Sequence, residues 1–110
     1  MTTFTGTQVK ADVQAILNDT TEWTDPEILA FINLALHQVC VDAPASRYSS
    51  PVSFGGDMSI AAIATAISMD VRWKKAVAHY TAFLCFNQSD RNTYNAAFAS
   101  EQYRLYKEAL

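Results

Sequence analysis

Residues 23–39, Trp-Thr-Asp-Pro-Glu-Ile-Leu-Ala-Phe-Ile-Asn-Leu-Ala-Leu-His-Gln-Val, carry the clearest folding signal in the chain. Thr24 and Glu27 stand three residues apart, as in a capping box, where the N-cap hydroxyl and the glutamate carboxylate each accept a hydrogen bond from the other residue's backbone N–H. Pro26 is tolerated in the first helical turn because its missing N–H would have no intrahelical partner there. The stretch therefore predicts a helix that begins just after Thr24.

The same stretch supplies a helical apolar face. Trp23 precedes the cap and can pack on Ile28, which predicts a hydrophobic staple. Further apolar residues recur at helical spacing for three turns, until Pro44 ends the pattern. This face consists of Ile28, Phe31, Ile32, Ala35, Leu36 and Val39.

Three more helices are predicted on either side of this one. A first helix is expected from about Thr7 to Leu17, because Val9, Val13, Ile16 and Leu17 share one face. A third, from Val71 to Asn87, follows a cap at Ser68 or Asp70 and carries a wide apolar face. A last helix is expected to start at a cap on Ser89 or Asp90 and to run nearly to Leu110.

The last helix has two apolar stripes, and a small core rarely needs both. The first stripe is Tyr94, Phe98, Leu105 and Ala109, and the second is Ala96, Ala99, Tyr103, Tyr106 and Leu110. We infer that one stripe packs inside the subunit and that the other meets a partner. Tyrosine suits the second role because its ring can be buried while its hydroxyl stays hydrated. Tyr103, Tyr106 and Leu110 are therefore the predicted interface, the alternative being that the helix is sandwiched within its own fold.

The segment between the second and third helices differs from the rest of the chain. Residues 44–58 are rich in Ser, Pro and Gly and predict a loop or an extended arm, in which 51–54 could form a short strand that turns at Gly55-Gly56. Val52 and Phe54 would be the contact residues of an arm that reaches a neighbouring protein, and a mobile surface loop is the alternative. Residues 59–67 are ambiguous, although their isoleucines fit a short helix.

Composition limits both the fold class and the function. A chain of 110 residues, half of them hydrophobic, predicts one mainly α domain over residues 1–110, with four helices, a long central loop at 44–58 and a C-terminal helix within 89–110. The net charge of −3 and the absence of a basic run argue against a direct nucleic-acid binder. No signal peptide or membrane-spanning stretch is evident, so a cytoplasmic, reducing environment is expected.

No pattern of catalytic residues is recognisable. Cys40 and Cys85 are isolated and are expected to be buried thiols, and neither His37 nor His79 has a metal-ligand partner at helical spacing. The chain has no phosphate-binding glycine loop. We therefore expect no enzyme, no cofactor and no metal site, and a nucleophilic Cys–His pair remains the enzymatic alternative.

Two segments resemble a known family. Residues 23–33, from Trp23 to Asn33, are similar to the opening of the small head-to-tail adaptor proteins (connector or head-completion proteins) of tailed bacteriophages. The aromatic helix 73–86, the turn and helix start at 90–99, and the ending from Tyr106 to Leu110 resemble the later part of the same family. Residues 44–67 match nothing in that pattern.

This resemblance implies a structural role in the virion. Such adaptors form a ring, commonly of twelve copies, beneath the portal of a filled capsid, where they extend the DNA channel and carry the tail or nozzle proteins. DNA would pass through the channel without specific binding, which is compatible with the acidic balance. By analogy, Tyr103, Tyr106 and Leu110 would face the portal, and the 44–57 arm a neighbouring subunit or the tail. The protein would assemble in the host cytoplasm and reside in the virion neck; a small cytoplasmic helical regulator that binds a protein partner is the alternative.

Overall fold

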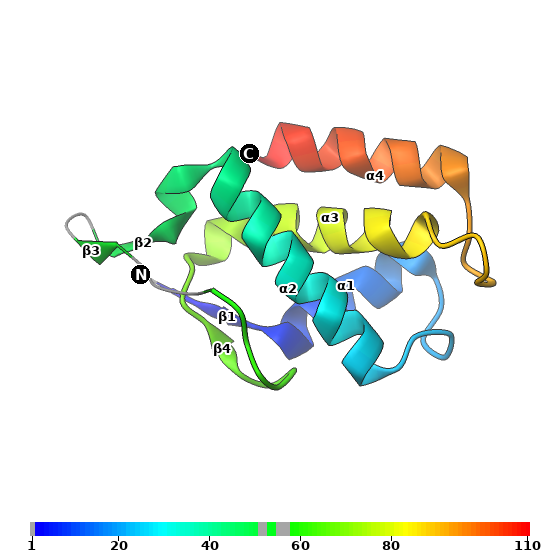
Figure 1. Cartoon of the computed structure of the whole chain (residues 1–110), viewed down its shortest axis with the longest axis horizontal. Helices are drawn as coiled ribbons and strands as arrows, with labels where there is room; N and C mark the ends of the chain where they lie inside the picture. Colours follow the sequence, from blue (N-terminus) through cyan, green and yellow to red (C-terminus); the bar gives the residue numbers. More distant parts are fainter. Residues whose placement is uncertain (1, 51–52, 55–57) are drawn as a thin grey trace.

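The computed structural model describes residues 2–50, 53–54 and 58–110 and has the mainly helical, four-helix architecture predicted from the sequence (Figure 1). In chain order, the elements are β1 (Phe4–Thr5), α1 (Gly6–Leu17), α2 (Asp25–Asp42), a 3₁₀ turn (Pro44–Arg47), β2 (Tyr48–Ser50), β3 (Ser53–Phe54), β4 (Ala66–Ile67), a second 3₁₀ turn (Val71–Trp73), α3 (Lys74–Phe86) and α4 (Ala96–Ala109).

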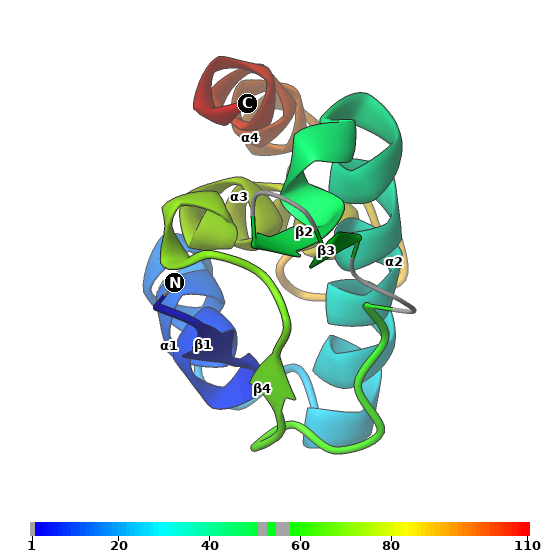
Figure 2. The same cartoon turned by 90° about the vertical axis from the view of Figure 1, so that its left-hand side faces the viewer.

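Helix α3 is the centre of the fold. It packs against α4 on one side and against α1 and α2 on the others, as the two views in Figures 1 and 2 show. It lacks a fully polar face, since its buried residues are distributed around its circumference: Ala76, Val77, Ala78, His79, Thr81, Ala82, Cys85 and Phe86. Helix α4, by contrast, lies at the edge and makes its main contacts with α3 alone.

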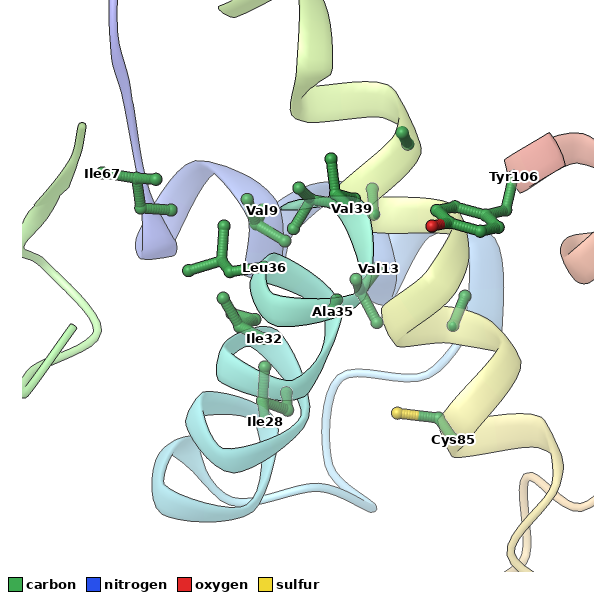
Figure 3. Close-up of a cluster of buried hydrophobic side chains, with 14 of the residues drawn as sticks. Val9, Val13, Ile28, Ile32, Ala35, Leu36, Val39, Ile67, Cys85 and Tyr106 are labelled. Atoms are coloured by element: carbon green, nitrogen blue, oxygen red, sulfur yellow. The ribbon is translucent and has the colours of Figure 1, made fainter. Parts of the chain in front are cut away.

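The core fills the space between α1, α2 and α3 (Figure 3). Val9 and Val13 of α1 and Ile32 and Leu36 of α2 are completely buried there. Full burial of an aliphatic side chain of this size stabilises a fold by about 1.5–3 kcal/mol. The predicted inner faces of α1 and α2 are therefore confirmed.

The predicted caps of α2 and, at Asp70, of the 3₁₀ turn that leads into α3 are confirmed, whereas the predicted cap of α4 is wrong. The capping box at α2 is confirmed, with the Glu27 carboxylate accepting the Thr24 N–H at 3.0 Å. The predicted start of α4 at Ser89 or Asp90 is wrong, because the cap is Asn95, whose side-chain oxygen accepts the Phe98 N–H at 3.0 Å. The N–H of Asn95 also binds the carbonyl of Phe86, which closes a compact connection after α3.

The short helix considered for residues 59–67 does not form. This part of the chain follows α2, and Asn33 takes both backbone groups of Ile60, accepting its N–H at 2.9 Å and donating to its carbonyl at 3.0 Å. The chain then reaches β4, where Ile67 pairs with Phe4 in an antiparallel ladder with β1. Partners outside the segment satisfy these backbone groups, so helical spacing within it does not decide its structure.

The predicted loop or arm at 44–58 contains local structure. It starts with the 3₁₀ turn at Pro44–Arg47, after which β2 and β3 pair antiparallel with Tyr48 opposite Phe54. The strand predicted within 51–54 is therefore present at Ser53–Phe54. Pro51, Val52 and the proposed Gly55-Gly56 turn lie outside the described residues.

The contact between α1 and residues 60–63 leaves no space for a side chain at Gly6. A Cβ there would overlap the carbonyl oxygen of Ile63 and would lie 2.8 Å from the Ile60 Cδ1 atom. We expect Gly6→Ala to lower the free energy of unfolding by about 1–3 kcal/mol, as overpacking does elsewhere. Ala11→Ser, which adds an atom at an exposed position of the same helix, is the control in urea unfolding. An unchanged midpoint for Gly6→Ala would contradict this packing.

Candidate protein–protein interface

Tyr106, the centre of the predicted interface stripe, belongs to the core. Its side chain is completely buried, its ring meets that of Tyr80 edge-on at 5.0 Å, and its hydroxyl donates to the Asp42 Oδ2 atom at 2.6 Å. Burial, followed by the hydrogen bond to Asp42, raises the pKa of Tyr106 well above the usual value for tyrosine. The assignment of Tyr106 to an exposed surface is corrected, because Asp42 of α2 replaces the water that its hydroxyl needs.

Tyr103 and Leu110, the other two predicted residues of the stripe, lie at its exposed margins. Tyr103 is 39% exposed, with its ring packed at 5.2 Å on Phe83 and the Lys107 ammonium 5.5 Å from the ring centre. Leu110 is 37% exposed and lines a surface pocket of about 370 Å³. An interface role for these two residues stays a prediction.

Two residues of the apolar stripe that the sequence assigned to the interior are exposed. Tyr94 and Phe98 are 47% and 55% exposed. Phe98 is nevertheless held in place, because its ring meets Phe86 of α3 edge-on at 5.5 Å. The inward stripe of α4 is centred on Ala99, whose small side chain allows close approach to α3, and on Tyr106. Each predicted stripe therefore has both exposed and inward-facing members, and neither stripe as a whole forms the inner face of α4.

The two predicted contact residues of the arm cannot be placed as contacts. Phe54 is in β3, opposite Tyr48, and only its backbone is described. Val52 lies outside the described residues. Their role in an interface stays a prediction.

The fold brings the two family-like segments together in one polar cluster. The Arg91 guanidinium lies 4.5 Å from the centre of the Trp23 ring and forms an ion pair with Glu27. The indole Nε1–H of Trp23 donates to the Thr93 hydroxyl at 3.0 Å. The pKa of Glu27 is lowered, first by the Thr24 backbone N–H and next by Arg91. These contacts join the start of α2 to the connection between α3 and α4. Residues of both segments therefore belong to one cluster, which we call the joint.

A second pair of contacts extends this joint. The Glu22 carboxylate accepts hydrogen bonds from the backbone N–H and the side-chain amide of Asn92, at 3.1 and 3.3 Å. A shallow groove of about 240 Å³ runs beside the joint, lined by Trp23, Glu27, Ala30, Phe31, Gln88, Asp90 and Arg91. The charged groups at its core are paired with each other, which favours a structural role over ligand binding.

Both cysteine thiols are harder to deprotonate than usual. Burial raises the pKa of Cys85 to about 12, so its thiol stays protonated at neutral pH. The pKa of Cys40 is also raised, mainly by burial, and its sulfur accepts the Ser46 hydroxyl at 3.8 Å. His79 binds the Gln102 side chain through Nδ1 at 2.6 Å, which ties α3 to α4.

Within residues 2–50, 53–54 and 58–110, no three His, Cys, Asp or Glu side chains are grouped closely enough to hold a metal ion. No helix in the same residues combines the length and the apolar character needed to span a bilayer.

No family model matches the chain, and neither a curated protein nor a solved structure is significantly similar to it.

The Tyr106–Asp42 hydrogen bond can be tested through stability. We expect Tyr106→Phe to lower the free energy of unfolding by about 1–2 kcal/mol at neutral pH, near the lower end for bonds to charged groups because Asp42 is exposed. Tyr103→Phe, at a half-exposed ring, is the matched control in urea unfolding and should change little.

The pH dependence of the stability of the same variant is a second, independent test of this hydrogen bond. Above about pH 10 an unfolded tyrosine releases its proton, whereas folded Tyr106 keeps it because its pKa is raised. Wild-type stability should therefore fall as the pH rises through this range, and Tyr106→Phe should fall less steeply. The pKa of Asp42 is lowered, first by Gln38 and next by Tyr106. In acid, as Asp42 takes up a proton, the difference in stability between the two proteins should narrow. Parallel pH profiles would contradict the hydrogen bond.

Proposed function

We propose that the protein is a head-to-tail adaptor of a tailed bacteriophage. In this function, copies of the chain form a ring between the portal and the tail, extend the DNA channel and provide the platform on which the tail docks. The observation that carries the proposal is the resemblance of residues 23–33 and of the later segments, from the aromatic helix at 73–86 onward, to that family.

The cluster around Trp23 gives these segments a physical reason to occur together. Trp23, Glu27 and Arg91 form one stacked and ion-paired unit, and Thr93 binds the indole. Arginine is hard to replace in such a unit, because its planar guanidinium stacks on an aromatic ring while it binds a carboxylate. The two segments therefore support the proposal together, because their residues contact one another in a single cluster.

The surface of the chain also supports a role in assembly. Tyr94 and Phe98 lie four residues apart, and both are about half exposed. Large exposed apolar side chains of this kind are typical of protein-binding surfaces when they gather in patches. The net charge of −3 is suited to a channel through which DNA passes without being held.

A mass measurement with the portal tests the proposal. Native mass spectrometry of the purified protein mixed with the portal ring of the same phage should reveal a complex with about one copy per portal subunit. Replacement of both Tyr103 and Leu110 by Ala should weaken the complex if these residues face the portal, whereas Leu34→Ala, on α2, is the control.

The outcomes separate the two classes of function. Failure of the wild-type protein to bind the portal under assembly conditions would contradict the adaptor function and favour a helical regulator with another protein partner. Binding that survives the Tyr103 and Leu110 replacements would keep the adaptor function and move the portal-facing surface elsewhere.

A further inference from the structure

An aromatic projection lies at one end of the molecule. Phe98 is in the first turn of α4 and Tyr94 is four residues before it, in the connection that follows α3. Both are about half exposed. The Phe98 ring is held against Phe86, so it can enter a partner without losing much side-chain entropy. We refer to Tyr94 and Phe98 as the aromatic projection.

A pocket of matching character lies at the other end. It has a volume of about 370 Å³ and is lined by Ala45, Arg72, Trp73, Ala109 and Leu110. A cavity of about 150 Å³ is enough to bind benzene, so one or two aromatic rings fit in this space. We refer to these five residues as the Trp73 pocket.

The projection and the pocket cannot meet within one molecule. Phe98 and Leu110 lie twelve residues apart on α4, which at about 1.5 Å per residue separates them by roughly 18 Å. Figure 1 shows the start of α4 and the connection before it at one end of the long axis, and the C-terminal end of α4 near the start of α3, toward the other.

The two ends also differ in charge. The connections 18–24 and 87–95 carry Asp19, Glu22 and Asp90, and their single cation, Arg91, is ion-paired with Glu27. At the pocket, the Arg72 guanidinium stands 5.1 Å from the Trp73 ring, and Lys75 is exposed one turn of the helix away. The carboxylate nearest in sequence, Asp70, accepts the Arg72 backbone N–H. The projection thus lies at an acidic end of the molecule, whereas the one charged residue that lines the pocket is the cation Arg72.

We propose that a second copy of this chain inserts its aromatic projection into the Trp73 pocket. Asp90 of the inserting copy would then approach Arg72 of the receiving copy, and the Phe98 ring would lie among Trp73, Ala109 and Leu110. The proposal rests on the proposed function in one respect, because it names the contact that would join neighbouring copies in the ring.

The symmetry of such a contact is distinctive. It joins two different surfaces, so a pair of copies still has one free pocket, on the inserting copy, and one free projection, on the receiving copy. The association therefore continues until a ring closes or a filament grows. A two-fold contact of the projection with itself would stop at a dimer and would involve no residue of the pocket.

Sedimentation analysis of wild type and two surface variants over a concentration series tests the contact. Phe98→Ser removes the projection, and Arg72→Glu places a carboxylate opposite Asp90. Each variant alone should associate at least about tenfold more weakly than wild type, as replacement of an interface anchor does. Leu34→Ser is the matched control, since Leu34 is 54% exposed and Phe98 55%, and it should associate like wild type.

A mixture of the two variants gives the decisive result. The Arg72→Glu protein retains its projection and the Phe98→Ser protein retains its pocket, so the mixture should form a one-to-one complex that grows no further. Far-ultraviolet circular dichroism checks that each variant keeps its helices.

Several results would overturn the proposal. These are a wild-type protein that stays monomeric at every concentration, association that survives Phe98→Ser, and variants that fail to complement each other. None of them decides the adaptor function, which depends on binding to the portal. Conversely, self-association of this kind without portal binding would sustain the contact and contradict the adaptor.

Discussion

The burial of α3 is the constraint on which the rest of the structure depends. A helix with apolar side chains around its circumference is stable in water only if neighbours cover it on several sides. The small residues Ala76, Ala78 and Ala82 let those neighbours approach closely. Helices α1 and α2 cover two sides, and α4 covers a third through Ala99 and Tyr106. The polar contacts then fix how these helices sit, since Gln102 binds His79 and Asp42 binds Tyr106.

The parts of this fold that could be predicted from the sequence are those decided locally. The cap and apolar face of α2 act within a few residues of each other, and the same holds for the central stretch of α3. The errors came from partners far along the chain. Asn33 takes the backbone groups of Ile60, Phe86 takes the N–H of Asn95, and Asp42 satisfies the Tyr106 hydroxyl. The spacing of residues within 59–67, 89–95 or 96–110 does not reveal these contacts, because each of them involves a residue outside the segment.

The same distinction, between what local spacing predicts and what distant contacts decide, applies to the candidate interface. Two apolar stripes on α4 follow from helical periodicity, but the choice of the inner one depends on which side chains fit against α3. Ala99 fits because it is small, and Tyr106 fits because α2 supplies an acceptor for its hydroxyl. This leaves Tyr94 and Phe98 outside, at the end of the molecule where the Trp23 cluster anchors the connection between α3 and α4. The cluster thereby positions a surface that the sequence had assigned to the core.

The central claim is that this chain works by packing its exposed ends against other proteins. Hydrogen–deuterium exchange of the free protein and of the protein assembled with its portal tests that claim most directly. The account predicts that amides at 94–98, 45–47 and 109–110 become more protected on assembly, while those in the middle of α3 stay unchanged. Equal protection of the two ends in both states would contradict it.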